Sequence, residues 1–142
     1  MEINLTNKTI FIDFEGTLSE SPKEEPTLGE LLFGQPFTNL KPNAKVIKLL
    51  EKVNPKKIYV LGIIDTNNEI QQKYFWLEQH YPKIEDQNVI FVANNHQKVD
   101  VISEYQKKLN LKTSDIVFID DKEKHLAPAR LKGFECVDVN NL

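Results

Sequence analysis

Cysteine is nearly absent from this sequence, since Cys136 is the single one among 142 residues. One thiol cannot form a disulfide within the chain, and it cannot supply the several sulfur ligands of a structural zinc site. Cys136 lies within the apolar segment 134–139, which indicates a position in the core.

Long apolar runs and an excess of positive charge are absent too. No apolar run approaches the roughly 18 residues that span a membrane, and the first residues lack the basic start and apolar stretch of a signal peptide. We therefore expect a cytoplasmic protein without a membrane partner. The formal net charge of −3 provides no general basic surface, so the sequence does not indicate nucleic acid as a partner.

The composition is otherwise that of a globular protein, with 40% hydrophobic and 27% charged residues. We expect one domain over residues 1–142. Five short apolar runs alternate with helical patterns, which predicts an α/β fold: a Rossmann-like three-layer sandwich with a parallel sheet and helices on both faces. The expected strands are 9–12, 57–62, 89–92, 116–119 and 134–139, and the expected helices are 43–53, 67–81, 99–109 and a short one at 126–129.

The first strand ends abruptly in Asp13, which is followed by Glu15 and Gly16. Ligands of a parallel sheet bind beyond the carboxyl ends of its strands, where both carboxylates fall. Because strand side chains have a period of two, Asp13 and Glu15 can point to the same side, while Gly16 permits a sharp turn. Taken alone, this stretch also fits an ordinary strand followed by a polar turn.

A long excursion, residues 19–43, follows directly and contains four prolines and two glycines. Loops of this length in compact domains are usually functional, and this one leaves the sheet beside the carboxylate pair. We expect a flap over the site. Thr27 and Glu30 have capping-box spacing, which predicts a short helix inside it.

Polar residues also follow the other strands at the same edge: Thr66 after the second, residues 94–98 after the third, and Asp120 with Asp121 after the fourth. Converging carboxylates repel one another unless a cation joins them, and hard oxygen ligands suit Mg²⁺ better than zinc or copper. The sequence therefore predicts a phosphate-binding Mg²⁺ site.

Such a site supports phosphoryl transfer. With Lys98 to neutralise the phosphoryl group, Asp13 is the candidate nucleophile that forms an aspartyl-phosphate. Glu15 is the candidate acid that protonates the leaving oxygen and afterwards activates water. His96 is a further candidate for substrate contact, or else a surface histidine.

These residues carry a family resemblance. Residues 13–18 (DFEGTL) closely resemble the first motif of the haloacid dehalogenase-like superfamily, and residues 116–121 (IVFIDD) resemble its fourth. Lys98 falls where the third motif has its lysine. The resemblance implies a small phosphatase with little or no separate cap domain and a sheet in the order 5-4-1-2-3.

The resemblance also implies the metal ligands: Asp13, the carbonyl of Glu15, and Asp120 or Asp121.

This chain departs from the family pattern at two positions. Family phosphatases usually carry Asp where this chain has Glu15, and the extra methylene moves the carboxyl by roughly 1 Å. They also carry, at the end of the second strand, a Ser or Thr whose hydroxyl contacts the phosphate. This chain has Gly62 there, so that phosphate contact is missing.

Two residues are candidates for the missing phosphate contact. Gly62 could offer its backbone N–H, and Thr66 could replace the hydroxyl if its loop folds back, although Thr66 equally fits as the cap of the helix that begins at Asn67. The substrate is expected to be a phosphorylated small molecule or macromolecule end.

Other functional classes compete with a phosphatase. One is a catalytically impaired domain of the same fold that binds a phosphorylated ligand or a protein partner. A response-regulator receiver domain fits poorly. Such a domain has its acidic pair near the first strand and its phosphorylated Asp near the third, whereas the acidic pair Asp120 and Asp121 follows the fourth strand here.

Overall fold

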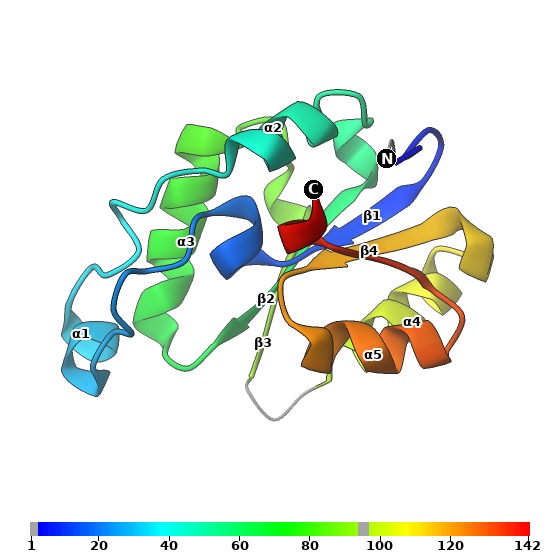
Figure 1. The fold of residues 1–142 in the computed structure, drawn as a ribbon. Helices are drawn as coiled ribbons and strands as arrows, with labels where there is room; N and C mark the ends of the chain where they lie inside the picture. The colour runs from blue at the N-terminus through cyan, green and yellow to red at the C-terminus, as the bar shows by residue number, and fades with distance from the viewer. Residues whose placement is uncertain (1–2, 94–96) are drawn as a thin grey trace.

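The computed structural model describes residues 3–93 and 97–142 of the chain. Its sheet is parallel, with five strands in the order β3-β2-β1-β4-β5 (Figure 1). Read from the other edge, this is the predicted order 5-4-1-2-3, which is thereby confirmed. The strands are β1 Thr9–Ile12, β2 Ile58–Ile64, β3 Val89–Ala93, β4 Ile116–Asp120 and β5 Glu135–Asp138.

Helices cover both faces of this sheet, as predicted, with α2 and α3 on one side and α4 and α5 on the other (Figure 1). Each face has its own core. In β1, Ile10 and Ile12 belong to the core under α2 and α3, whereas Phe11 belongs to the core under α4 and α5. The helices are α2 Ala44–Leu50, α3 Asn67–His80, α4 Lys98–Lys108 and α5 Glu123–Leu131.

The buried side of α3 is partly polar. Trp76 and Leu77 are buried there, and so are the side chains of Glu69, Gln72 and Lys73. Burying a charge requires partners in the protein, so these polar residues are expected to belong to a network near the sheet edge. Across residues 3–93 and 97–142, no helix has both the length and the apolar character needed to cross a membrane.

The second strand is longer than predicted. We expected it to end at Gly62, but β2 continues to Ile64 because it pairs with β3 as far as Ala93. Gly62 therefore lies inside the sheet, opposite Phe91. This correction matters for the site, because it moves the carboxyl end of β2 to Ile64, directly before Asp65.

Residues 19–43 form the predicted flap, with its ends joined by an antiparallel bridge between Ser19 and Pro42. Inside it lies α1, Leu28–Phe33, which begins with the predicted capping box of Thr27 and Glu30. The flap is tied to α3: the amides of Asn68 and Gln72 donate to the Gly34 carbonyl, and the Trp76 indole donates to the Leu40 carbonyl at 2.7 Å.

Short turns complete the chain. A wide turn, Phe14–Leu18, follows Asp13, and its backbone is not helical at Glu15 and Gly16. Single 3₁₀ turns lead into β2, β3 and β4 and another follows β5, at Pro55–Lys57, Asp86–Asn88, Thr113–Asp115 and Val139–Asn141.

Candidate active site

Asp13 stands at the carboxyl end of β1, where its N–H donates to the Ile119 carbonyl of β4. The backbone is extended at Asp13 and at Glu15, and it turns at Gly16, whose φ is +77°. That φ favours glycine, and a Cβ at this position would also collide with the Asp121 carboxylate. The sequence therefore needs glycine here for two acidic strand ends to approach one another.

Asp120, the last residue of β4, is fully buried and has four polar partners. Its Oδ1 accepts from the N–H groups of Asp121 and Lys122 at 2.7 and 3.0 Å. Its Oδ2 lies 2.8 Å from Lys98 Nζ and 3.1 Å from His125 Nδ1. Burial opposes the charged form, but the His125 contact and the Lys98 charge outweigh it and hold the pKa of Asp120 below its usual range.

Lys98 joins the two acidic strand ends. It is the first residue of α4, its side chain is 1% exposed, and its Nζ lies 2.6 Å from Asp13 Oδ1 as well as 2.8 Å from Asp120 Oδ2. Burial lowers the pKa of Lys98, but the two carboxylates outweigh burial and raise the pKa above its usual value. The ammonium is therefore a fixed positive charge beside Asp13.

Asp13, Asp120 and Asp121 form an acidic cluster, with one oxygen of each within 4.8 Å of the others. Asp121 Oδ1 is buried and accepts no hydrogen bond from any described residue. Burial, followed by the nearby Asp13 and Asp120 carboxylates, raises the pKa of Asp121 to about 8. A carboxylate oxygen without a donor, beside two others, is the environment that a hard cation stabilises.

This cluster predicts a dependence of stability on pH and Mg²⁺. Because the pKa of Asp121 rises from 3.8 in the unfolded chain to about 8 in the fold, stability without Mg²⁺ should fall as pH rises through that window. The lowered pKa of Asp120 changes the stability only at pH values below this window. The Tm measured without Mg²⁺ should therefore decline towards pH 8, and saturating Mg²⁺ should restore it.

Asp121→Asn is the matched variant for this measurement, since it keeps the shape of the side chain and removes the titrating group. Its Tm should change less with pH over the same window and should respond less to Mg²⁺ than the Tm of the wild type. An unchanged pH profile and Mg²⁺ response in Asp121→Asn would place the cation elsewhere.

Glu15 faces the same pocket but is held by a residue that the sequence did not suggest. Lys73 Nζ of α3 lies 2.8 Å from Glu15 Oε1, and the Glu15 side chain is 36% exposed while that of Lys73 is 1% exposed. Glu15 is thus a partly exposed carboxylate that is fixed from its buried side.

The two candidates for the missing phosphate contact do not join this group. Gly62 lies two residues before the end of β2, where a Cβ would come within 3.3 Å of the Phe91 ring. The Thr66 hydroxyl donates to the Leu31 carbonyl of the flap at 2.9 Å, and the Thr66 N–H donates to Glu69 Oε2 at 2.6 Å. Thr66 is therefore the N-cap residue of α3 and also contacts the flap, which matches the capping alternative.

The acidic cluster opens into a pocket of about 450 Å³, within the range of small-molecule sites. Flap residues form part of its wall, as we expected from the position of residues 19–43. The lining includes Asp13, Glu15, Lys73, Lys98, Asp121, Lys122, His125 and, from the flap, Ser21, Pro22, Glu25, Leu31 and Phe37. Carboxylates, ammonium groups and an imidazole therefore share one cavity.

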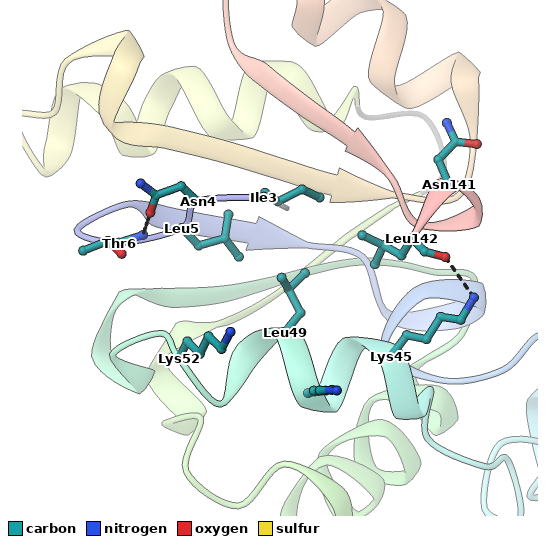
Figure 2. Close-up of a pocket in the computed structure, with 10 residues that line it drawn as sticks. Ile3, Asn4, Leu5, Thr6, Lys45, Leu49, Lys52, Asn141 and Leu142 are labelled. Atoms are coloured by element: carbon teal, nitrogen blue, oxygen red, sulfur yellow. Dashed lines mark hydrogen bonds between the residues drawn. The ribbon is translucent and has the colours of Figure 1, made fainter. Parts of the chain in front are cut away.

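A larger pocket, of about 790 Å³, lies apart from these groups (Figure 2). Lys45 of α2 and Lys52, which follows that helix, line one side, and residues 3–6 with Leu142 line the other. Lys45 Nζ donates to the Leu142 carbonyl at 2.8 Å. Its described lining contains no Asp, Glu, His or Cys side chain. We therefore assign the chemistry to the smaller pocket, where acids and bases converge.

Lys73 and His125 were missed at the level of sequence. Glu69 and Lys73 share a helix face with Trp76, and this buried polar spacing was the available signal for Lys73. His125 lies in the first turn of α5, directly after the acidic pair, but nothing in its own neighbourhood distinguishes it from a surface histidine. Residues 94–96, which include the candidate His96, lie outside the described residues.

No protein-family model and no curated protein matches the sequence. Solved structures do match the fold. The N-terminal part of BF1531 from Bacteroides fragilis, which contains a phosphatase domain and was solved with Mg, matches with a TM-score of 0.59 and 18% identity. The match covers 92% of this chain and 35% of that chain.

Two further structures match over 92% of this chain at 15% identity. They are the Pnkp1/Rnl/Hen1 RNA repair complex (TM-score 0.58, 42% of that chain) and the HAD domain of effector protein Lem4 from Legionella pneumophila (TM-score 0.53, 85% of that chain). This chain spans less than half of the matched chains of BF1531 and the RNA repair complex. The chain has the fold of haloacid dehalogenase-like domains, as its motifs suggested.

Proposed function

We propose that this chain is a Mg²⁺-dependent phosphohydrolase that cleaves a phosphate ester through an aspartyl-phosphate on Asp13. The observation that carries the proposal is the acidic cluster of Asp13, Asp120 and Asp121, in which one oxygen of each lies within 4.8 Å of the others. The buried Lys98 joins Asp13 to Asp120. Carboxylates and a fixed ammonium at the carboxyl ends of parallel strands are the groups that phosphoryl transfer requires.

Asp13 is the nucleophile. Its Oδ1 is paired with Lys98 and its Oδ2 accepts from the Thr17 hydroxyl at 3.1 Å, so the carboxylate is held in one orientation. A carboxylate oxygen of Asp13 forms a bond to phosphorus while the bond from phosphorus to the substrate's ester oxygen breaks. Fixing the attacking group before reaction removes part of the entropic barrier.

Glu15 moves the proton in both half-reactions. Protonated Glu15 gives its proton to the departing ester oxygen, so the alcohol leaves neutral. The resulting Glu15 carboxylate then takes a proton from water, whose oxygen attacks phosphorus as the bond to Asp13 breaks. Inorganic phosphate leaves, and Asp13 and protonated Glu15 are restored.

The residues present fit a hard divalent cation, because Asp121 Oδ1 is buried without a donor from the described residues. Asp13, the carbonyl of Glu15, and Asp120 or Asp121 would hold Mg²⁺. When bound, Mg²⁺ supplies positive charge that offsets the phosphoryl group and the crowded carboxylates. Lys98 adds a second positive charge, and His125 holds Asp120 in place.

The substrate is a phosphorylated small molecule or the phosphorylated end of a macromolecule. The pocket of about 450 Å³ has room for a phosphate ester, with Lys122 and His125 at its wall as additional positively charged or hydrogen-bonding groups. The flap, which forms part of the same wall, is the element that would contact the group attached to the phosphate.

The test is release of phosphate from a generic aryl phosphate, with and without Mg²⁺. We expect turnover that depends on Mg²⁺ and is removed by chelation. A protein that binds Mg²⁺ and a phosphate analogue but never releases phosphate from a broad panel of esters would favour the ligand-binding alternative. A protein that does neither would contradict both functions.

A further inference from the structure

Lys73 is a buried lysine whose shortest contact is with Glu15, a residue that lines the pocket. Its Nζ lies 2.8 Å from Glu15 Oε1, 3.7 Å from Glu69 Oε1 and 3.2 Å from the Ile63 carbonyl oxygen. A side chain that is 1% exposed needs such partners to keep its charge. Glu15, as the closest carboxylate, is its main partner.

Glu69 is engaged elsewhere and cannot replace Glu15. Its Oε2 accepts from the N–H groups of Asp65 and Thr66 at 2.7 and 2.6 Å, which fixes the carboxylate at the start of α3. Its Oε1 remains 3.7 Å from Lys73 Nζ, beyond an ordinary hydrogen bond. Lys73 is therefore held in the fold by Glu69 and Ile63 and directed at Glu15.

Two aromatic rings complete the surroundings of this ammonium group. Lys73 Nζ lies 4.6 Å from the ring centroid of Phe37 and 5.4 Å from that of Phe14, both within the range of cation–π attraction. Phe37 belongs to the flap, while Phe14 lies between Asp13 and Glu15 in the chain. The position of Lys73 is thus fixed on several sides at once.

We propose that Lys73 is a positioning residue that fixes the Glu15 carboxylate for proton transfer. A glutamate has one more rotatable bond than the aspartate usual at this position, so it needs an additional contact to stay in one orientation. Lys73 takes Oε1, which leaves proton transfer to Oε2. The inference rests on the proposed function, and it explains how the site accommodates the longer side chain.

The experiment is a kinetic double-mutant cycle of Lys73→Met and Glu15→Gln, assayed with an aryl phosphate in Mg²⁺. In the wild-type background, Lys73→Met should lower kcat by about 10²-fold, because a misplaced catalytic group costs about that much, and should change KM by less than about threefold. In the Glu15→Gln background, the same change should have almost no further effect on kcat, because the residue that it positions no longer transfers protons.

Two outcomes would overturn the inference. One is an unchanged kcat in Lys73→Met. The other is an equal loss, or a raised KM, in both backgrounds, because that would mean Lys73 binds the substrate itself. An inactive wild type would instead refute the proposed function, so the two failures are distinguishable.

Two controls separate positioning from loss of stability. Asn88→Ala removes hydrogen bonds to the Lys56 and Ile58 carbonyls at the start of β2, so it should lower Tm and leave kcat unchanged. Lys73→Gln, which keeps a hydrogen-bond donor, replaces Lys73→Met in the cycle if the latter does not fold. A kcat loss in Lys73→Gln that persists in the Glu15→Gln background would likewise overturn the inference.

Discussion

Asp13→Asn is expected to abolish phosphate release, lowering kcat by about 10³-fold or more, as removal of a catalytic nucleophile does in other enzymes. The amide is nearly isosteric and can still accept a hydrogen bond from Thr17, but it does not form a stable covalent bond to phosphorus. Lys98 keeps its second partner, Asp120, so the fold should survive with a Tm change of a few degrees.

The measurement is steady-state phosphate release, together with rapid quenching to trap a phosphorylated protein. The wild type should yield a hydroxylamine-sensitive acyl phosphate on Asp13, and the variant should yield none. Asp115→Asn is the matched control, because Asp115 Oδ2 accepts from the Lys112 N–H in the turn before β4 and Asp115 does not line the pocket of the acidic cluster. Wild-type turnover in Asp13→Asn would exclude Asp13 as nucleophile.

The fold was predictable because its signals are local. The apolar runs of the central strands β1 and β4 are buried on both faces of the sheet, and α1, α2 and α3 begin after the polar residues Thr27, Asn43 and Thr66, as expected. The boundary error at β2 has a physical cause. Its last residues, Ile63 and Ile64, follow a glycine that resembles a strand end, but pairing with Val92 and Ala93 of β3 extends the strand past it.

Residues of the candidate site could be predicted from the sequence when they directly follow a strand. Those that lie on the face of a helix could not. Asp13, Asp120 and Asp121 were found because parallel topology alone brings strand ends to one edge. Lys73 could not be found in this way, because its partner Glu15 is distant in the chain and only the packing of α3 against the sheet brings the two together. His125 lies five residues after its partner Asp120, but it is on α5 and does not itself follow a strand end. Contacts of that kind depend on helix rotation, which sequence spacing does not specify.

The position of Glu15 illustrates the same limit. Comparison with the family motif marked Glu15 as a departure but did not indicate which residue contacts its longer side chain. In the structure, α3 contacts Glu15 through Lys73, and the flap contributes Phe37 beside the Lys73 ammonium group. The flap and α3 therefore both help to fix the Lys73 ammonium group that contacts Glu15.

Glu15→Gln should lower kcat by about 10²-fold or more, because the amide keeps the shape of the side chain and loses the proton that general acid–base catalysis transfers. Glu15→Asp tests a different property, the reach of the carboxyl group. Shortening the side chain moves the carboxyl by roughly 1 Å away from Lys73, and a displacement of that size can cost about 10²-fold in rate. Steady-state kinetics with a poor and a good leaving group measure both effects.

Lys73 cannot follow the shorter side chain, since the Ile63 carbonyl at 3.2 Å and the Phe37 ring at 4.6 Å hold its ammonium group in place. We therefore expect Glu15→Asp to be slower than the wild type, although it restores the residue usual in the family motif. Turnover in Glu15→Asp that equals or exceeds the wild type would show that the Lys73 contact does not tune Glu15. If the wild type and both variants bind Mg²⁺ and a phosphate analogue but release no phosphate, the pocket binds its ligand without turnover.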